Sequence, residues 1–289
     1  MLKDIGLIYG SLYSVALWVL AIAYLALFLL AMEMGFRFAR RVAPDVLQRV
    51  NTPVLAIETA MLGLLGLLLG FSTSMSVSRF EERKHLVLEE ANALGTSYLR
   101  TQLLASPHDK EMQALLCRYV DLRLESTKAG EDLARITAAR NVTMRLQTEF
   151  WNKVSVFAKN DPHPVPASLL LQSINQAIDM EGARWMALHN IVPHSVMIAN
   201  ATVGLLAASL VGYSFGLAGS RQPYSMAILS IAITIVLVVI IDLDRPRSGS
   251  IRVSQQPMID LRTQMVGQNG NCPQGDQYGA AKDPARSLQ

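Results

Sequence analysis

Side chains that could carry out chemistry are few in this sequence and widely separated. The two cysteines, Cys117 and Cys272, have no CxxC or CxxH neighbour, and we interpret them as reduced thiols without a disulfide. His189 and His194 flank Pro193, where interfacial hydrogen bonding is a simpler role than metal binding. Nucleophile, zinc, phosphate-loop and dinucleotide motifs do not occur. The sequence therefore predicts no enzyme, no metal and no cofactor.

The most informative stretch is LGLLGLLLGFSTSMSVSRF, residues 62–80. A spacing of four separates Gly66 from Gly70, as in helices that pack closely, and Ser74 and Ser78 continue this small stripe. An adjacent stripe holds Gly63, Leu67 and Phe71. Two interpretations follow. The stripes either pack inside one subunit, or they form a pore wall with an apolar constriction near Phe71 and a serine-lined vestibule beyond it.

Acidic residues lie before and after this stretch. Glu58 is the only charge between Val54 and Phe71, and acids within spans face protein or water. It is a candidate for a pore mouth or an inter-helix contact, the alternative being a side chain that reaches the interface. The pairs Glu81–Glu82 and Glu89–Glu90 suggest a solvated helix face with basic neighbours, and their spacing does not match a calcium loop.

Four apolar blocks provide the elements that would position these residues. Hydrophobic residues make up 51% of the 289-residue chain, and the mean hydropathy is +0.27. Each block is long enough, at about 1.5 Å per helical residue, to cross a bilayer core of about 30 Å. The blocks cover residues 5–34, 54–71, 196–217 and 224–241. The net charge of +3, without basic clusters that contain aromatics, argues against nucleic acid binding.

Amphipathic helical patterns fill the region between the second and third blocks. Since no proline stands between Pro53 and Pro107, we expect one helix from residue 54 to about 104. Three more helices are expected at 109–126, 131–158 and 167–188. The predicted fold is therefore all-α, with a helical domain inserted between two membrane hairpins. The boundaries are 5–76 and 193–242 for the hairpins, 77–192 for the domain, 243–265 for a C-terminal segment and 266–289 for a disordered tail.

Lysine and arginine near the ends of the spans predict the orientation. Nine lie on the side of the N-terminus, the central domain and the C-terminus: Lys3, Arg79, Arg83, Lys84, Arg184, Arg245, Arg247, Arg252 and Arg262. Five lie on the opposite side: Arg37, Arg40, Arg41, Arg49 and Arg221. The balance favours a cytoplasmic domain and cytoplasmic termini, although the first hairpin loop alone argues the opposite way.

Residues 69–80 resemble the second-helix signature of the bestrophin channels, which have Leu-Gly-Phe, a hydroxyl residue and Val-Thr-Arg-Trp at the same offsets. Residues 78–100, with 241–257, look still more like the bacterial bestrophin-like domain family. The residues that carry this second resemblance include Arg79, Asp242, Asp244, Arg245, Pro246, Gln255, Gln256 and Pro257.

The resemblance implies a homo-oligomer, a pentamer in bestrophins, whose second helix lines a central pore for small inorganic ions. The implied apolar neck falls on Gly63, Leu67 and Phe71, where Gly63 departs from the bulky pattern. The acidic calcium clasp of animal bestrophins has no counterpart, because Asp242 and Asp244 stand there beside three arginines. The leading function is thus a bestrophin-like channel of the bacterial inner membrane, in contact with membrane lipid. The alternative is a non-conducting scaffold or sensor whose helical bundle binds a partner.

Overall fold

The computed structural model describes residues 15–41, 44–130, 132–160, 165–269 and 272, and the regular elements among them are all α-helices. This confirms the predicted fold class. Among these described residues, four stretches are long and apolar enough to cross a membrane: Leu17–Ala39, Pro53–Thr101, Val165–Leu217 and Pro223–Asp244. The chain divides into two compact units. We call residues 1–80 with 190–252 the span unit, and residues 81–189 with 253–289 the bundle unit.

Helix α3 (Pro44–Thr101) contributes residues to both units. Its 58 residues confirm that the second apolar block continues into the charged region as one helix. The helix begins at Pro44 rather than at the expected residue 54, so Pro53 lies inside it. The absence of proline between Pro53 and Pro107 leaves the backbone hydrogen-bond ladder uninterrupted through this change of polarity.

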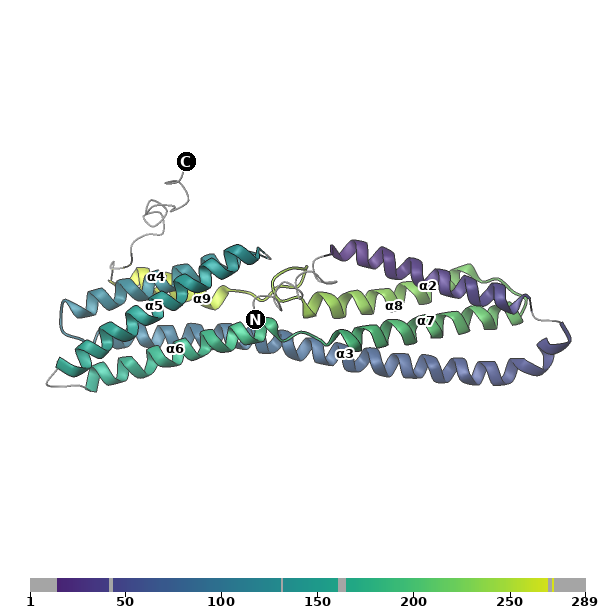
Figure 1. Ribbon diagram of the computed structural model, residues 1–289, viewed down its shortest axis with the longest axis horizontal. Coiled ribbons are helices and arrows are strands. Elements are labelled where there is room, and N and C mark those ends of the chain that lie inside the picture. Colours follow the sequence, from purple (N-terminus) through teal and green to yellow (C-terminus); the bar gives the residue numbers. More distant parts are fainter. Residues whose placement is uncertain (1–14, 42–43, 131, 161–164, 270–271, 273–289) are drawn as a thin grey trace, which may run out of the picture. The chain divides into compact units, whose positions relative to one another are not determined.

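In the span unit, α2 (Leu17–Ala39) lies beside α7 (His194–Leu217) and α8 (Pro223–Asp244) (Figure 1). The first span was expected over residues 5–34, but α2 extends to Ala39, and residues 5–14 lie outside the described residues. Phe28, Met32 and Leu237 are fully buried in its core. A Cβ added to Gly216 would lie 2.7 Å from the carbonyl oxygen of Phe36, so glycine is needed for this helix approach.

Replacing Gly216 with alanine is therefore expected to destabilise the span unit by about 1–3 kcal/mol, because the backbone of α2 would have to move. The control is Gly182→Ala in α6 (Val165–His189), where a Cβ would meet no atom of the described residues within 4 Å. Thermal unfolding of the detergent-purified protein should show a lower Tm for Gly216→Ala and an unchanged Tm for Gly182→Ala. Equal Tm values would contradict the close packing of α2 on α7.

The bundle unit packs α4 (His108–Lys128), α5 (Leu133–Asn160), α6 (Val165–His189) and α9 (Gln256–Asn269) with the second half of α3. The three helices expected after α3 are confirmed. Helix α9 was not predicted, and residues 266–269 of the expected disordered tail belong to it. Its buried Met258, Leu261 and Met265 have helical spacing, a signal that the sequence already contained. Of the remaining tail, residues 270–271 and 273–289 lie outside the described residues.

Cys117 of α4 and Cys272 form a disulfide, with their Cα atoms 5.7 Å apart. The interpretation of both residues as reduced thiols is therefore wrong. The two cysteines are 155 positions apart in sequence. They meet because both are buried in the core that α4 and α9 share, which local sequence patterns cannot reveal.

Candidate functional site: the exposed face of helix α3

Helix α3 has a buried and an exposed face within the span unit. Leu65, Leu69, Ser72 and Ser76 are buried at spacings of three and four. The residues assigned to a pore wall lie on the other face and are all exposed: Gly63, Leu67, Phe71, Ser74 and Ser78. The exposed fraction is 55% for Leu67 and 64% for Phe71. A single chain thus leaves this face uncovered.

The glycines of this region do not serve packing within one chain. A Cβ added to Gly63, Gly66 or Gly70 would meet no atom of the described residues within 4 Å. The interpretation that this stripe packs inside one subunit is therefore wrong. The Gly66–Gly70 spacing remains available for contact with a second chain.

Polar contacts attach the buried face of α3 to α7. The amide of Asn200 donates a 2.7 Å hydrogen bond to the Ser72 hydroxyl, and both side chains are buried. Nearer the start of the span, Ser214 donates a hydrogen bond to the Glu58 carboxylate. Glu58 is half-buried and makes an inter-helix contact at this point. Because buried polar groups need partners, these bonds select which face of α3 turns outward.

The carboxylates at the end of α8 accept hydrogen bonds from backbone amides. Asp244 is fully buried and accepts a 2.9 Å bond from the Val192 amide, and the Arg79 guanidinium lies 3.9 Å from its other oxygen. Asp242 accepts bonds from the amides of Ser250 and Ile251 at 2.9 and 3.2 Å. Among the described residues, no group of three His, Cys, Asp or Glu side chains could hold a metal ion.

The other residues that carry the family resemblance lie after the end of α8 and around the start of α9. Arg245 donates to the carbonyl of Val15, and Pro246 follows it in the non-helical segment. Gln256 donates to Asp260 at 2.8 Å, and Pro257 lies in the first turn of α9. Gln255 accepts a 3.1 Å bond from Arg184 within the bundle unit. Through these contacts, residues after the end of α8 and around the start of α9 engage a backbone carbonyl and side chains.

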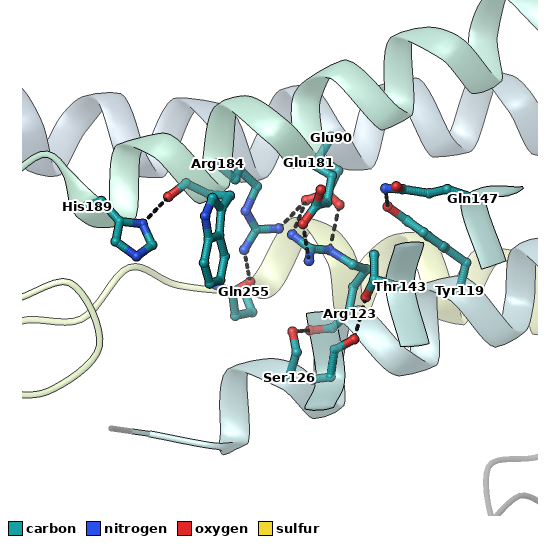
Figure 2. Close-up of polar contacts among 12 residues, drawn as sticks. Glu90, Tyr119, Arg123, Ser126, Thr143, Gln147, Glu181, Arg184, His189 and Gln255 are labelled. Atoms are coloured by element: carbon teal, nitrogen blue, oxygen red, sulfur yellow. Dashed lines mark hydrogen bonds and ion pairs between the residues drawn. The ribbon is translucent and has the colours of Figure 1, made fainter. Parts of the chain in front are cut away.

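A buried ion cluster in the bundle unit was missed by the sequence analysis (Figure 2). Glu90 is completely buried and accepts hydrogen bonds from Arg123 at 2.7 and 3.2 Å and from Arg184. Glu181 lies 3.5 Å from Arg123. The expected solvated face is therefore wrong for Glu90. Its spacing of three from Val87 and four from Leu94, both buried, was the available signal.

Burial and charge act against each other in this cluster. Burial disfavours the charged form of Arg123, but Glu90, Tyr119 and Glu181 together outweigh it and raise the pKa of Arg123. Burial likewise raises the pKa of Tyr119, whose hydroxyl accepts a 3.1 Å bond from Gln147. Arg123 and Tyr119 therefore stay protonated at neutral pH, and the cluster joins α3, α4 and α6 by fixed charges.

The helices, spans and uncovered α3 face define a multi-pass, all-helical membrane protein. Residues 22–258 match the family model of the Bestrophin-like domain, so the chain belongs to that family. Comparison with curated proteins gave no match.

Solved structures show the same fold. A variant of a bacterial bestrophin homologue from Klebsiella pneumoniae superposes with a TM-score of 0.65 at 14% identity, covering 87% of this chain and 97% of the other. The structure of that homologue solved by Zn-SAD phasing gives 0.61 at 16% identity, with coverages of 86% and 99%. A structure described as a membrane protein gives 0.64 at 15%, with coverages of 86% and 97%. Identities this low establish the fold alone.

Proposed function

We propose that the chain forms a homo-oligomeric ion channel of the bacterial inner membrane in which the exposed face of α3 lines the pore. The observation that carries this proposal is the exposure of all five predicted pore residues on one face: Gly63, Leu67, Phe71, Ser74 and Ser78. A lipid-facing stripe has no need of serines at successive turns, whereas a water-filled path is compatible with them. The bestrophin resemblance suggests five copies around the path.

The constriction is proposed at Phe71. This residue directly follows Gly70, and the hydroxyl-bearing segment Ser72-Thr73-Ser74 begins immediately after it. Rings from several copies at one level would form an apolar collar that water enters reluctantly. Leu67 lies one turn away on the same face and would add a second apolar layer.

The test is a planar-bilayer recording on the purified protein, together with its oligomer order by native mass spectrometry. The proposal expects discrete currents from a pentamer. A dimer that carries no current would contradict it and would favour the scaffold alternative.

One observation favours a partner-binding role for the bundle unit. A cavity of about 480 Å³ is lined by residues of α5 and α6: Met144, Gln147, Thr148, Trp151, Asn175 and Ile178. Trp151 is 44% exposed there, and exposed aromatic residues are enriched where proteins bind partners. We propose this surface as the contact site if the protein is a scaffold or sensor.

We propose that the bundle unit is cytoplasmic, following the nine-to-five excess of Lys and Arg on its side. The Cys117–Cys272 disulfide points to the opposite side, since such bonds persist in oxidising compartments. We base the orientation on the Lys and Arg balance, because these charges act while the spans insert, before the bundle unit folds.

Cysteine labelling in intact cells tests this orientation. Thr127 in α4 and Ser220 in the loop before α8 are both exposed, so cysteines there would be accessible. Ser220→Cys should react with a membrane-impermeant maleimide in intact cells, whereas Thr127→Cys should react only after permeabilisation. The reverse pattern would overturn the proposed orientation.

A further inference from the structure

An apolar groove of about 850 Å³ opens on the surface of the span unit. Its apolar walls come from α2, α3 and α7, which belong to three of the four stretches long and apolar enough to cross a membrane, and comprise Met34, Phe38, Ile57, Met61, Leu206 and Leu210. From Leu206 to Tyr213 the groove follows α7 for about 10 Å at the rise of an α-helix. It therefore suits an elongated apolar occupant that enters from the side of the bilayer.

One end of the groove carries positive charge. Arg37 in the last turn of α2 and Arg41, two residues beyond the end of the helix, both line the groove there. The Arg37 side chain is 72% exposed, and only its Nε atom pairs with the Glu33 carboxylate, at 2.8 Å. Arg41 is exposed and forms no ion pair with a described residue. Phe38 and Tyr213, with ring centroids 6.0 Å apart, lie at this same end.

An apolar groove that ends beside aromatic rings and guanidinium groups matches the acyl chain and the headgroup of a phospholipid. Aromatic rings such as those of Phe38 and Tyr213 are suited to the headgroup level of a bilayer. Guanidinium groups bind phosphate oxygens by paired, charge-assisted hydrogen bonds. The apolar part of the groove extends from that level toward the middle of the span.

A second copy of the chain is a poorer occupant. Four acidic residues of the span unit have described side chains, and each already has a partner. Glu33 bonds Arg37 and Arg221, and Glu58 accepts from Ser214. Asp242 and Asp244 accept backbone amides at the end of α8. The described surface of the span unit thus offers no unengaged carboxylate to meet the two arginines.

We propose that this groove is a binding site for an anionic phospholipid, with an acyl chain between α2, α3 and α7 and the headgroup phosphate on Arg37 and Arg41. The proposal does not depend on ion conduction. It concerns lipid binding to the span unit, whether or not the oligomer conducts ions.

The experiment is native mass spectrometry of the detergent-purified protein titrated with phosphatidylglycerol or with phosphatidylcholine of the same acyl chains. Each basic side chain near an anionic lipid contributes about 1 kcal/mol, so phosphatidylglycerol should bind the wild type roughly thirtyfold more tightly. Combining Arg37→Gln with Arg41→Gln should remove this preference. The matched control is Arg40→Gln, because Arg40 is exposed on the same turn and does not line the groove.

A second variant tests the acyl site separately from the headgroup. Leu206 is 56% exposed at the apolar end, so Leu206→Trp should fill the groove without disturbing the core, and should weaken binding of both lipids. Unchanged phosphatidylglycerol binding by the double arginine variant would overturn the proposal. So would efficient disulfide cross-linking between copies through Leu206→Cys in bilayers, because the groove would then be covered by a second chain.

Discussion

Replacing Phe71 with alanine is expected to increase the conductance or leak of the reconstituted protein several-fold while leaving the oligomer intact. The side chain is 64% exposed in the chain, so its removal leaves little cavity in the core. We expect a stability loss below about 1 kcal/mol, as for surface substitutions. A phenylalanine packed within one subunit would instead cost about 3–5 kcal/mol.

Two further variants sharpen the measurement in bilayer recordings. Leu67→Ala should change permeation in the same direction as Phe71→Ala, because the two residues lie one turn apart on the same face. Ile235→Ala in α8 is the control, since Ile235 is 57% exposed but lies on another helix. Permeation that neither Phe71→Ala nor Leu67→Ala alters, from an intact oligomer, would rule out the pore assignment.

Replacing Glu90 with glutamine is expected to destabilise the bundle unit by about 3–5 kcal/mol. The substitution leaves the guanidinium groups of Arg123 and Arg184 buried without their shared carboxylate. Breaking a buried ion pair by removing one partner carries a cost of this size, because the remaining charge stays desolvated. Chemical denaturation followed by near-UV circular dichroism measures the loss.

The adjacent Glu89→Gln is the matched control for this prediction. Its carboxylate is 37% exposed and lies 3.7 Å from His85, so the change should remain within about 0.5 kcal/mol. Combining Glu90→Gln with Arg123→Gln should cost less than the sum of the two single substitutions, since both remove the same contact. A Glu90→Gln variant as stable as Glu89→Gln would show that the cluster contributes nothing to folding.

Glu89 and Glu90 also show where prediction from the sequence stopped. A pair of adjacent acids appears as a solvated face, yet successive residues of a helix point about 100° apart. Glu90 falls on the buried face with Val87 and Leu94, while Glu89 remains half-exposed beside His85. The spacing could have indicated this burial. Arg123 of α4 and Arg184 of α6 compensate the buried charge of Glu90. That these helices bring them next to Glu90 could not be predicted.

The sequence alone determined the helical class, the four apolar blocks and the unbroken course of α3, because these depend on hydropathy and on where proline stands along the chain. Local chemistry of this kind acts within a few turns and can be detected residue by residue. The tertiary structure alone decided which side of α3 is covered, by hydrogen bonding Ser72 to Asn200, 128 positions away. It likewise joined Cys117 to Cys272. Such contacts depend on how helices distant in sequence pack together, which periodicity within a single helix does not specify.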